Sequence, residues 1–503
     1  MAITFNNIPT TIRTPNVYLE VDNSRALKGL LANPYKVLIV GQKVSEGAGV
    51  NDVLYAITKD GLANGYFGPG SILARMCNVF KLNNQNTELY AVSLSDPAGG
   101  VAASATIKFS VALSAVAIGG SLSGTEPIYM LVNGKPIYET LYSGWSVKDI
   151  NSAIQSTINA DSTLAVKAST TVASALNLIA VNVGSWGNLL SVRFNFYEGQ
   201  SYPTTMNDSV PTILSFAGGV GCADVGDAWA VVDGQQFQII ISPYTDSANM
   251  IELKDELADR FKPDEDLWGH GITAYPGTQA SCTTIGNSHN SPHVTMIGAY
   301  NSPTPPEEWA AALGAVAAAK LNDDPARPLQ FLKLAGVIAP NATDRFSRAE
   351  RDILLYDGIA TWICDTEGNV MIERCITTYK TNVLGLADYS YLDIETLATL
   401  AEIRYQYKAR MQTRFILPRY KLADDSFPVP PGAYIVTPKT IRQETIALFG
   451  MLQDKGLVEN LEDFITNLIV ERNAADRNRV DVLLPPDLVN QFRILAGVIQ
   501  FIL

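Results

Sequence analysis

The chain has 503 residues, of which 47% are hydrophobic and 17% charged, and a formal net charge of −13. This composition is typical of a globular protein with several domains and a large core, and it excludes a disordered chain. The negative charge argues against nucleic acid and anionic lipid as general partners, because both select a basic face.

Targeting signals and cysteines indicate where the chain is made. Residues 1–7 lack the basic start and the apolar run of a secretory signal, and no apolar stretch reaches membrane-spanning length. The five cysteines are widely spaced and form no CxxC pair, as expected for buried thiols in a reducing compartment. We therefore expect synthesis in a cytoplasm, no general secretory export and no membrane anchor.

The first 24 residues are expected to form an extended arm. Pro9 and Pro15 hold this stretch extended and exclude a helix. Apolar and polar side chains alternate from residue 17 to residue 22, which is typical of a half-buried strand. This strand either folds back on the chain's own domain or pairs with another molecule, and its candidate pairing residues are Val17, Tyr18, Leu19 and Val21.

Residues 25–100 alternate strand and helix patterns, which predicts a mainly parallel sheet. A fully buried strand is expected over 36–41 and another strand over 89–94. Between them we expect a helix over 53–62, a glycine-rich loop over 65–70 and a helix that Ser71 caps and that ends near residue 80.

The composition changes over residues 101–217. Only eight of the ninety residues from 101 to 190 are charged, and serine, threonine, valine and alanine are abundant. One helix, expected from Ser146 to residue 159, interrupts short strands. We therefore expect a β-rich domain inserted into the first domain. It should lie on the outside of an assembly, because the surrounding fold must close without it.

The α/β pattern returns at residue 218. Strands are expected over 236–242 and 294–298, followed by a hairpin with strands at 361–364 and 370–373. Helices are expected over 247–261, 306–321, 394–415, 440–454 and 460–473.

Residues 481–503 are expected to form a second arm. No charge follows Arg493, and apolar side chains occupy both parities, as in a strand buried on both faces. Ten uncharged residues are too few to span a bilayer, and an exposed strand so apolar would aggregate. The double proline at 485–486 favours an arm that leaves its domain over a last strand of the chain's own core. The candidate pairing residues are Phe492, Ile494, Val498 and Phe501.

The sequence contains no recognisable motif for catalysis or cofactor binding. The loop 41–49 follows a buried strand but has neither the dinucleotide nor the P-loop glycine pattern, so an ordinary turn is the better interpretation. His289 and His293 lie four residues apart, but Pro292 prevents a shared helix face. No G-x-S-x-G sequence occurs. We therefore expect no catalytic residue, no cofactor and no metal, and hence no enzyme.

A local reversal of charge lies between residues 404 and 421, where six basic residues and no acid occur. The segment is either a solvated helix face or a docking surface for an acidic protein partner, and nucleic acid is the weaker choice. Tyr405 and Tyr407 would suit an interface. The candidate docking residues are Arg404, Lys408, Arg410 and Arg414.

Short motifs at both ends of the chain are distinctive. They are NIP at 7–9, RTPNVY at 13–18, DNS at 22–24, RNRVD at 477–481 and LPPDLVNQF at 484–492. With the chain length and the order of segments, they resemble the contractile tail sheath proteins of Mu-like bacteriophages. That family usually has glycine where Asn16 stands, and the change leaves the segment extended.

The resemblance implies a structural protein that assembles with itself. Sheath subunits form stacked six-fold rings around a rigid tube, and their terminal arms add strands to sheets of neighbouring subunits. Contraction drives the tube through the host envelope for genome ejection. The implied partners are further copies of the chain, the tail tube protein, and the baseplate and tail terminator proteins. The implied location is the virion tail, assembled in the host cytoplasm. Because the C-terminal domain of the family generally faces the tube, 404–421 is a candidate surface for docking the tube or another subunit.

These predictions combine into an α/β protein with a mainly parallel-sheet core, an inserted β-rich domain, an α+β C-terminal domain and extended N- and C-terminal arms. The alternatives are a sheath of a phage-derived bacteriocin, another self-assembling protein, or an α/β enzyme without a recognisable site. The resemblance also implies a subtilisin-like core without a protease triad. The expected parts are an N-terminal arm (1–24), a core domain in two pieces (25–100 and 218–385), an inserted outer domain (101–217), a C-terminal sheath domain (386–480) and a C-terminal arm (481–503).

Overall fold

The computed structural model describes residues 14–15, 17, 30–108, 125–142, 145–172, 175–202, 212–430 and 432–502. The chain divides into two compact units. The large unit consists of Pro34–Ala401 with Asn490–Leu503, and the small unit of Met1–Asn33 with Glu402–Val489. The predicted arm residues Tyr18, Leu19 and Val21 lie outside the described residues.

A six-stranded sheet with the order β13-β12-β11-β1-β3-β2 forms the centre of the large unit. All neighbouring strands are parallel except β2, which runs antiparallel to β3 at one edge. The strands are β1 (Lys36–Gln42), β2 (Leu54–Ala56), β3 (Glu88–Leu94), β11 (Ile239–Ile241), β12 (His270–Tyr275) and β13 (Val294–Gly298).

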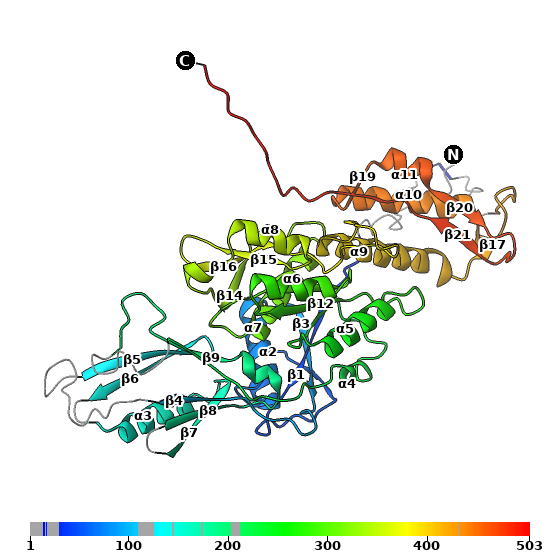
Figure 1. Cartoon of the computed structure of the whole chain (residues 1–503). Coiled ribbons are helices and arrows are strands. Elements are labelled where there is room, and N and C mark those ends of the chain that lie inside the picture. Colours follow the sequence, from blue (N-terminus) through cyan, green and yellow to red (C-terminus); the bar gives the residue numbers. More distant parts are fainter. Residues whose placement is uncertain are drawn as a thin grey trace. The chain divides into compact units, whose positions relative to one another are not determined.

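Helices cover both faces of this sheet, which is why its strands are apolar on both parities (Figure 1). Val37 and Ile39 of β1 belong to the core cluster that contains α2 and α7. Leu38 and Val40 belong to the cluster on the opposite face, with α4, α5 and α6. The helices of the core are α1 (Leu62–Phe67), α2 (Ile72–Asn83), α4 (Gly226–Trp229), α5 (Ser247–Arg260), α6 (Gln279–Ser288), α7 (Pro306–Asp323) and α8 (Arg348–Tyr356).

The long helix α7 packs unusually close to the sheet. Its sequence is rich in alanine, and nearly all of its side chains from Pro306 to Ala318 are buried. A Cβ atom added at Gly314 would lie 2.4 Å from Cδ1 of Ile241 in β11. A larger residue at this position would therefore force the Ile241 side chain to shift, and glycine allows the close approach of helix and strand.

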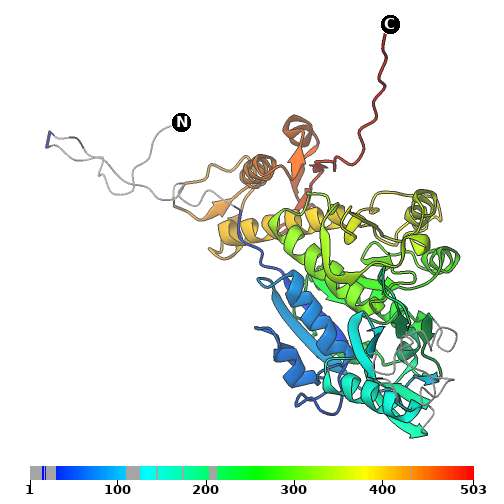
Figure 2. The same ribbon diagram turned by 90° about the vertical axis from the view of Figure 1, so that its left-hand side faces the viewer.

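Residues 101–220 form two small sheets and a helix beside the core of the large unit (Figure 2). Their two ends pair with each other, because Val101 and Val220 exchange two backbone hydrogen bonds of 3.0 Å. The sheets have the orders β4-β8-β7 and β10-β9-β5-β6. The elements are β4 (Ser104–Lys108), β5 (Thr125–Val132), β6 (Lys135–Tyr142), α3 (Val147–Ala160), β7 (Val166–Val172), β8 (Ala175–Ala180), the 3-10 helix η3 (Ser185–Leu189), β9 (Ser191–Phe194) and β10 (Ile213–Ser215).

A fourth sheet of the large unit has three strands, in the order β14-β16-β15. Its strands are β14 (Lys333–Ile338), β15 (Thr361–Cys364) and β16 (Asn369–Arg374), and β15 and β16 form the predicted hairpin. The short 3-10 helix η4 (Ala342–Asp344) follows β14. A single parallel bridge between Ile297 and Ala360 links this region to β13.

The small unit combines helices with three two-stranded sheets. The helix α9 (Ile394–Met411) begins in the large unit and continues as the π-helix η5 (Gln412–Ile416). The remaining elements are β17 (Lys421–Leu422), β18 (Ile435–Val436), α10 (Pro438–Asp454), β19 (Val458–Glu459), α11 (Leu461–Asn467), β20 (Ile469–Arg472), β21 (Val480–Leu483) and β22 (Asp487–Leu488). They pair as β17-β18, β19-β22 and β20-β21.

Several predicted elements were wrong or missed. The helix expected over 53–62 is the edge strand β2, because pairing with β3 outweighs the local pattern. The loop expected over 65–70 includes the end of α1. The helix expected over 460–473 stops at Asn467, and the β-branched pair Ile469 and Val470 starts β20. Strand β12 was not predicted.

Within the described ranges, no helix has both the length and the apolar character that crossing a bilayer requires.

Candidate subunit interface

The C-terminal segment is exposed although it is strongly apolar. Figure 1 shows residues 490–502 as an extended trace, and no strand or helix is assigned to them. Of the predicted pairing residues, Phe492, Ile494, Val498 and Phe501 are 72–88% exposed. Extended backbone with unburied apolar side chains on both parities is the conformation of a strand that lacks a sheet.

One side chain of this segment, that of Arg493, is largely buried. The side chain of Arg493 is only 11% exposed and makes ion pairs with Asp393 (3.0 Å) and Glu395 (3.1 Å). The two acids flank the first residue of α9, where the helix dipole stabilises negative charge. Sequence reasoning singled out the apolar residues and missed this contact. Its only signal was that Arg493 is the last charge in the chain.

The arm begins later than residue 481. Strand β21 pairs with β20 and strand β22 with β19, so residues 480–488 belong to sheets of their own small unit. The double proline at 485–486 therefore connects two paired strands and does not stand at the base of a free arm. The extended segment begins at Asn490.

The basic segment is partly neutralised within its own unit. Arg410 and Arg414 both contact Glu444 of α10, Arg414 at 3.2 Å. Arg404 is half-buried and Lys408 exposed on the same helix, α9. The prediction rested on the absence of acids within 404–421, but the neutralising carboxylate comes from a helix 30 residues further along the chain.

An apolar groove of about 420 Å³ lies in the small unit next to this basic segment. Sequence analysis did not predict it, because its walls come from helices and strands that are far apart in the chain. The groove is lined by Tyr407, Met411, Phe415, Ile416, Tyr420, Leu422, Val436, Ile441, Asn478, Val480 and Val482.

Of the predicted N-terminal pairing residues, the structure describes Val17, which is 81% exposed. Residues 31 and 32 contact α9: Gln406 accepts a hydrogen bond from the Leu31 amide (2.9 Å), and Tyr405 donates one to the Ala32 carbonyl (3.0 Å). The end of the N-terminal segment is thus attached to the small unit.

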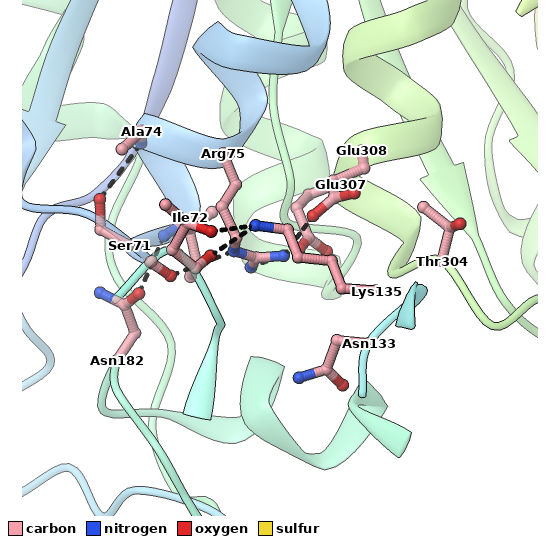
Figure 3. Close-up of polar contacts among 12 residues, drawn as sticks. Ser71, Ile72, Ala74, Arg75, Asn133, Lys135, Asn182, Thr304, Glu307 and Glu308 are labelled. Carbon is pink, nitrogen blue, oxygen red and sulfur yellow. Dashed lines mark hydrogen bonds and ion pairs between the residues drawn. The ribbon is translucent and has the colours of Figure 1, made fainter. Parts of the chain in front are cut away.

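A buried ionic network joins the insert to the core of the large unit. Arg75 of α2 forms ion pairs of 2.6 Å with Glu307 and with Glu308 of α7 (Figure 3). The indole of Trp186, in η3, donates a hydrogen bond to Glu307 (3.0 Å) and stacks near the Arg75 guanidinium. The amide of Ile72 donates to the side chain of Asn182 (2.9 Å), which adds a second link between α2 and the insert. These contacts hold residues 101–217 against α2 and α7.

The network carries two carboxylates and one guanidinium in an enclosed place. Burial raises the pKa of Glu307 to about 7, although Arg75 acts against this shift. Burial also lowers the pKa of Lys135, whose ammonium group donates to the Thr163 carbonyl (3.1 Å). A network of this kind fixes relative positions, and breaking it by removing one partner leaves a buried charge.

The sequence also singled out the loop 41–49 and the histidines His289 and His293 as sites to examine. In the loop 43–49 the amides of Val44, Ala48 and Gly49 donate to carbonyls of residues 65–67, so they are not available to cradle a phosphate. His293 is buried against Phe261, whereas His289 is only half-buried. Across the described ranges, no three histidine, cysteine or acidic side chains gather closely enough to hold a metal ion.

Comparison with known proteins identifies the family. Residues 218–378 match the phage tail sheath protein central domain, and residues 387–502 match the phage tail sheath C-terminal domain. The chain is 34% identical over 503 residues to the Mu-like prophage FluMu tail sheath protein of Haemophilus influenzae (strain ATCC 51907 / DSM 11121 / KW20 / Rd), and the match covers both chains completely.

Solved structures are similar at lower identity. The sheath tail protein of Desulfitobacterium hafniense is 13% identical with a TM-score of 0.49, and the match covers 95% of this chain and 97% of that one. The anti-feeding prophage helical sheath in the contracted state is 11% identical with a TM-score of 0.46, covering 97% and 99%. The two family domains span more than half of the chain, and the Haemophilus relative matches it from end to end. The chain therefore belongs to the phage tail sheath family, as its terminal motifs predict.

Proposed function

We propose that this sheath protein polymerises into stacked six-fold rings around a tail tube and that the sheath contracts to drive the tube through the host envelope for genome ejection. The observation that carries the proposal is the uncharged segment 494–502, which is extended and whose large apolar side chains are exposed. The role is structural, its location is the virion tail, and assembly takes place in the host cytoplasm.

The exposed segment has enough apolar surface to hold a neighbouring subunit. Burying six large side chains at about 1.5–3 kcal/mol each gives on the order of 10 kcal/mol as an upper bound. A micromolar complex needs about 8 kcal/mol, so several such arms per ring would support a stable polymer once ordering costs are subtracted. The six residues are Ile494, Leu495, Val498, Ile499, Phe501 and Ile502.

We propose that the small unit of a neighbouring copy accepts the arm. Among the described residues, β20 and β21 pair only with each other, so each has an open edge to which a strand can be added. Val480 and Val482 of β21 also line the apolar groove. An arm that adds to this hairpin would place apolar side chains over the groove. The N-terminal arm, with Val17, Tyr18, Leu19 and Val21, is proposed to pair in the same manner.

The basic segment is proposed to dock an acidic surface of the tube or of another subunit. Arg414 keeps 49% of its side chain exposed despite its contact with Glu444, and Lys408 is exposed one and a half turns earlier. Arg404 and Arg410 lie on the same helix and complete the candidate surface. Docking by charge complementarity would make the association sensitive to salt.

We further propose that the chain has the domains that the sequence predicts, with one boundary changed. The paired ends at Val101 and Val220 support an inserted outer domain over 101–217 between the core pieces 25–100 and 218–385. The C-terminal sheath domain extends beyond 480, because β21 and β22 belong to it. Baseplate and tail terminator proteins are the proposed partners at the two ends of the sheath.

Deletion of residues 494–503 tests the proposal. The truncated chain should melt at the parental temperature, because the large apolar side chains described over 494–502 are exposed. It should form no tubes or rings in negative-stain microscopy and no fast-sedimenting material. The matched control replaces 494–503 by a glycine–serine segment of equal length, which keeps the chain length and removes the apolar side chains. Tubes formed by either variant at the parental concentration would contradict the proposed role of the arm.

We also propose that contraction uses energy stored in subunit interfaces and no bound nucleotide. The support is the loop 43–49, in which the amides of Val44, Ala48 and Gly49 already donate to backbone carbonyls. Purified tails should contract to the same extent after dialysis and nuclease or phosphatase treatment as before. Contraction that starts only when a nucleoside triphosphate is added would overturn this statement.

A further inference from the structure

The point at which the C-terminal arm leaves its subunit is defined by a single side chain. Arg493 is 11% exposed, whereas Ile494 and Leu495 immediately after it are 81% and 85% exposed. The change from a buried to an exposed side chain therefore falls between two consecutive residues. Every later apolar residue that the structure describes is also largely exposed.

The site that holds Arg493 is built from acids that need a cation. The side chain of Glu395 is fully buried, and its carboxylate accepts the Leu329 amide at 2.6 Å as well as contacting Arg493. Burial raises the pKa of Glu395, and the positive charge of Arg493 acts against this shift. Removing the guanidinium would leave this carboxylate without its cation.

The second acid, Asp393, is shared between two arginines. Arg374 of β16 donates two hydrogen bonds to Asp393, of 3.0 and 2.9 Å, and Arg493 approaches the same carboxylate at 3.0 Å. Two arginines and two acids thus give a balanced cluster on the folded large unit. The cluster is complete only when the C-terminal segment lies in it.

The backbone beside Arg493 is held as well. The side chain of Gln330 donates a hydrogen bond to the Phe492 carbonyl (3.4 Å). On the other side of the connection 490–492, the Val489 amide donates to the Leu457 carbonyl (3.2 Å) in the small unit. The chain is therefore attached to its own subunit on both sides of residues 490–492, and no attachment is seen for residues 494–502.

We propose that Arg493 is the anchoring residue of the C-terminal arm, and that the segment exchanged between subunits is only 494–503. This inference rests on the proposed function and adds to it the place where the exchanged strand starts. The anchor orders the base of the arm before association, so a neighbouring subunit meets an arm with a fixed origin and a smaller loss of chain entropy on binding. During contraction the anchor would keep the arm attached to α9 and β16 of its own subunit.

Trypsin digestion of the unassembled full-length chain tests the anchor directly. Trypsin cuts after arginine, and a cut after Arg493 releases the decapeptide 494–503, which mass spectrometry can follow. Arg477 and Arg479 serve as internal references, because both side chains are 66% exposed. We expect release of the decapeptide to be at least about tenfold slower than cleavage at these references, because trypsin must wait for the buried side chain to leave its site. Release at the reference rate would overturn the proposal.

The variant Glu395→Gln keeps the cleavage site and weakens the acid site. It should release the decapeptide faster than the parental chain, while cleavage after Arg477 and Arg479 stays unchanged. A release rate equal to the parental one would show that Glu395 does not hold Arg493, and would contradict the proposal. The measurement needs no assembly, so it is independent of the proposed function.

Assembly measurements then connect the anchor to polymerisation. Arg493→Gln removes the charge, and the double variant Arg493→Gln, Glu395→Gln removes both charges and so avoids a lone buried carboxylate. We expect the double variant to melt cooperatively but to need about tenfold higher concentration to form tubes, because the base of the arm is no longer ordered. Lys262→Gln removes an exposed, ion-paired cation of the large unit, serves as the surface control and should assemble normally.

The outcomes separate the two proposals. If deletion of 494–503 prevents assembly and the double variant assembles at the parental concentration, the anchor is wrong and the proposed function stands. If the deletion variant itself assembles normally, the proposed function is wrong whatever trypsin shows.

Discussion

Strand β1 and the segment 494–502 have similar side chains and opposite surroundings. In β1, Val37, Leu38, Ile39 and Val40 are completely buried, with one parity against α2 and α7 and the other against α4, α5 and α6. In the segment 494–502, an equally apolar run carries side chains that are 78–101% exposed. An apolar pattern on both parities therefore predicts that a strand is buried in its final state, but not which molecule buries it.

The difference depends on what precedes each segment. Strand β1 starts a β-α-β unit whose helix returns the chain to a parallel neighbour, so its pairing is decided within about 50 residues. The segment 494–502 comes at the end of the chain, after Arg493 has been taken into the acid site of α9. Among the described residues this segment pairs with no strand and its large side chains are exposed, and we propose that a neighbouring subunit covers it.

The largest expected effect comes from placing a carboxylate in each region. Ile39→Asp puts an unpaired charge into the completed core and should cost about 5 kcal/mol or more, which is comparable with the whole stability of a domain. Ile499→Asp should change the free energy of unfolding by less than about 0.5 kcal/mol, because the residue is 94% exposed, and should prevent assembly. Urea unfolding and sedimentation measure the two effects. Equal loss of stability in both variants would remove the distinction between the regions.

A second prediction concerns the ionic network that links the insert to the core. Arg75→Met leaves Glu307 and Glu308 without their cation and should destabilise the large unit by about 3–5 kcal/mol. Lys167→Met, which removes an exposed ion pair with Glu46, should cost about 0–1 kcal/mol and serves as the control. Thermal unfolding of both variants measures these two losses of stability. A small loss for Arg75→Met would mean that the enclosed region tolerates an incomplete network.

A third prediction uses pH, because the core holds buried titratable side chains and the segment 494–502 holds no titratable side chain. Burial lowers the pKa of His270 to about 3 and of His293 to about 4. As the pH falls through 6.5 the unfolded chain takes up these protons first, so each histidine should reduce stability by about 2 kcal/mol between pH 7 and pH 5.

Protonation of Glu307 changes the stability in the opposite direction as the pH falls. Its pKa is raised to about 7, so the folded chain takes up this proton first as the pH falls from 7 towards 4.5, and stability rises by about 2 kcal/mol over the same interval. Glu307→Gln should therefore make the acid-induced loss steeper. Urea unfolding at pH 7 and pH 5 tests this, and an unchanged difference between the two pH values in the variant would contradict the assigned sign.

The smallest expected effect lies in the insert. Ser146 caps α3 and forms a capping box with Asp149, so Ser146→Ala should cost about 1 kcal/mol. Ser156→Ala, on the exposed face of the same helix, should change stability by only a few tenths of a kcal/mol. Neither variant should alter assembly, since the insert is not part of the arm. An assembly defect in Ser146→Ala with only a small loss of stability would show that the insert contributes to subunit contacts.

Much of the fold could be predicted where local signals and tertiary contacts agree. The cap at Ser71, the proline at the start of α7 and the alternation of buried strand and helix all led to elements that the structure contains. Strand β2 could not be predicted, because its three residues are held by pairing with β3 and lack a periodic pattern of their own. Strand β12 was missed because His270 and Gly271 interrupt its apolar run.

The candidate interface was predictable only in part. The exposed apolar residues follow directly from the sequence at 494–502. The ion-pair partners of the charged residues could not be predicted, because they are distant in the sequence. Glu444 lies 30 residues from Arg414, and Glu395 lies 98 residues from Arg493. The groove formed by Tyr407, Phe415 and Val480 likewise depends on which helices and strands meet, and a single sequence does not contain that information.

The paired ends of the insert have a practical consequence for engineering. Val101 and Val220 lie opposite each other in one pair of backbone hydrogen bonds, so the chain leaves and re-enters the core at a single place. A fluorescent or affinity module with adjacent termini can therefore be joined there as one cassette, which must also cover the core side chains that residues 101–217 bury. Replacing residues 101–217 also removes the indole of Trp186, which donates a hydrogen bond to Glu307. The cassette must therefore supply another hydrogen-bond donor to this carboxylate, or Glu307→Gln must remove its charge.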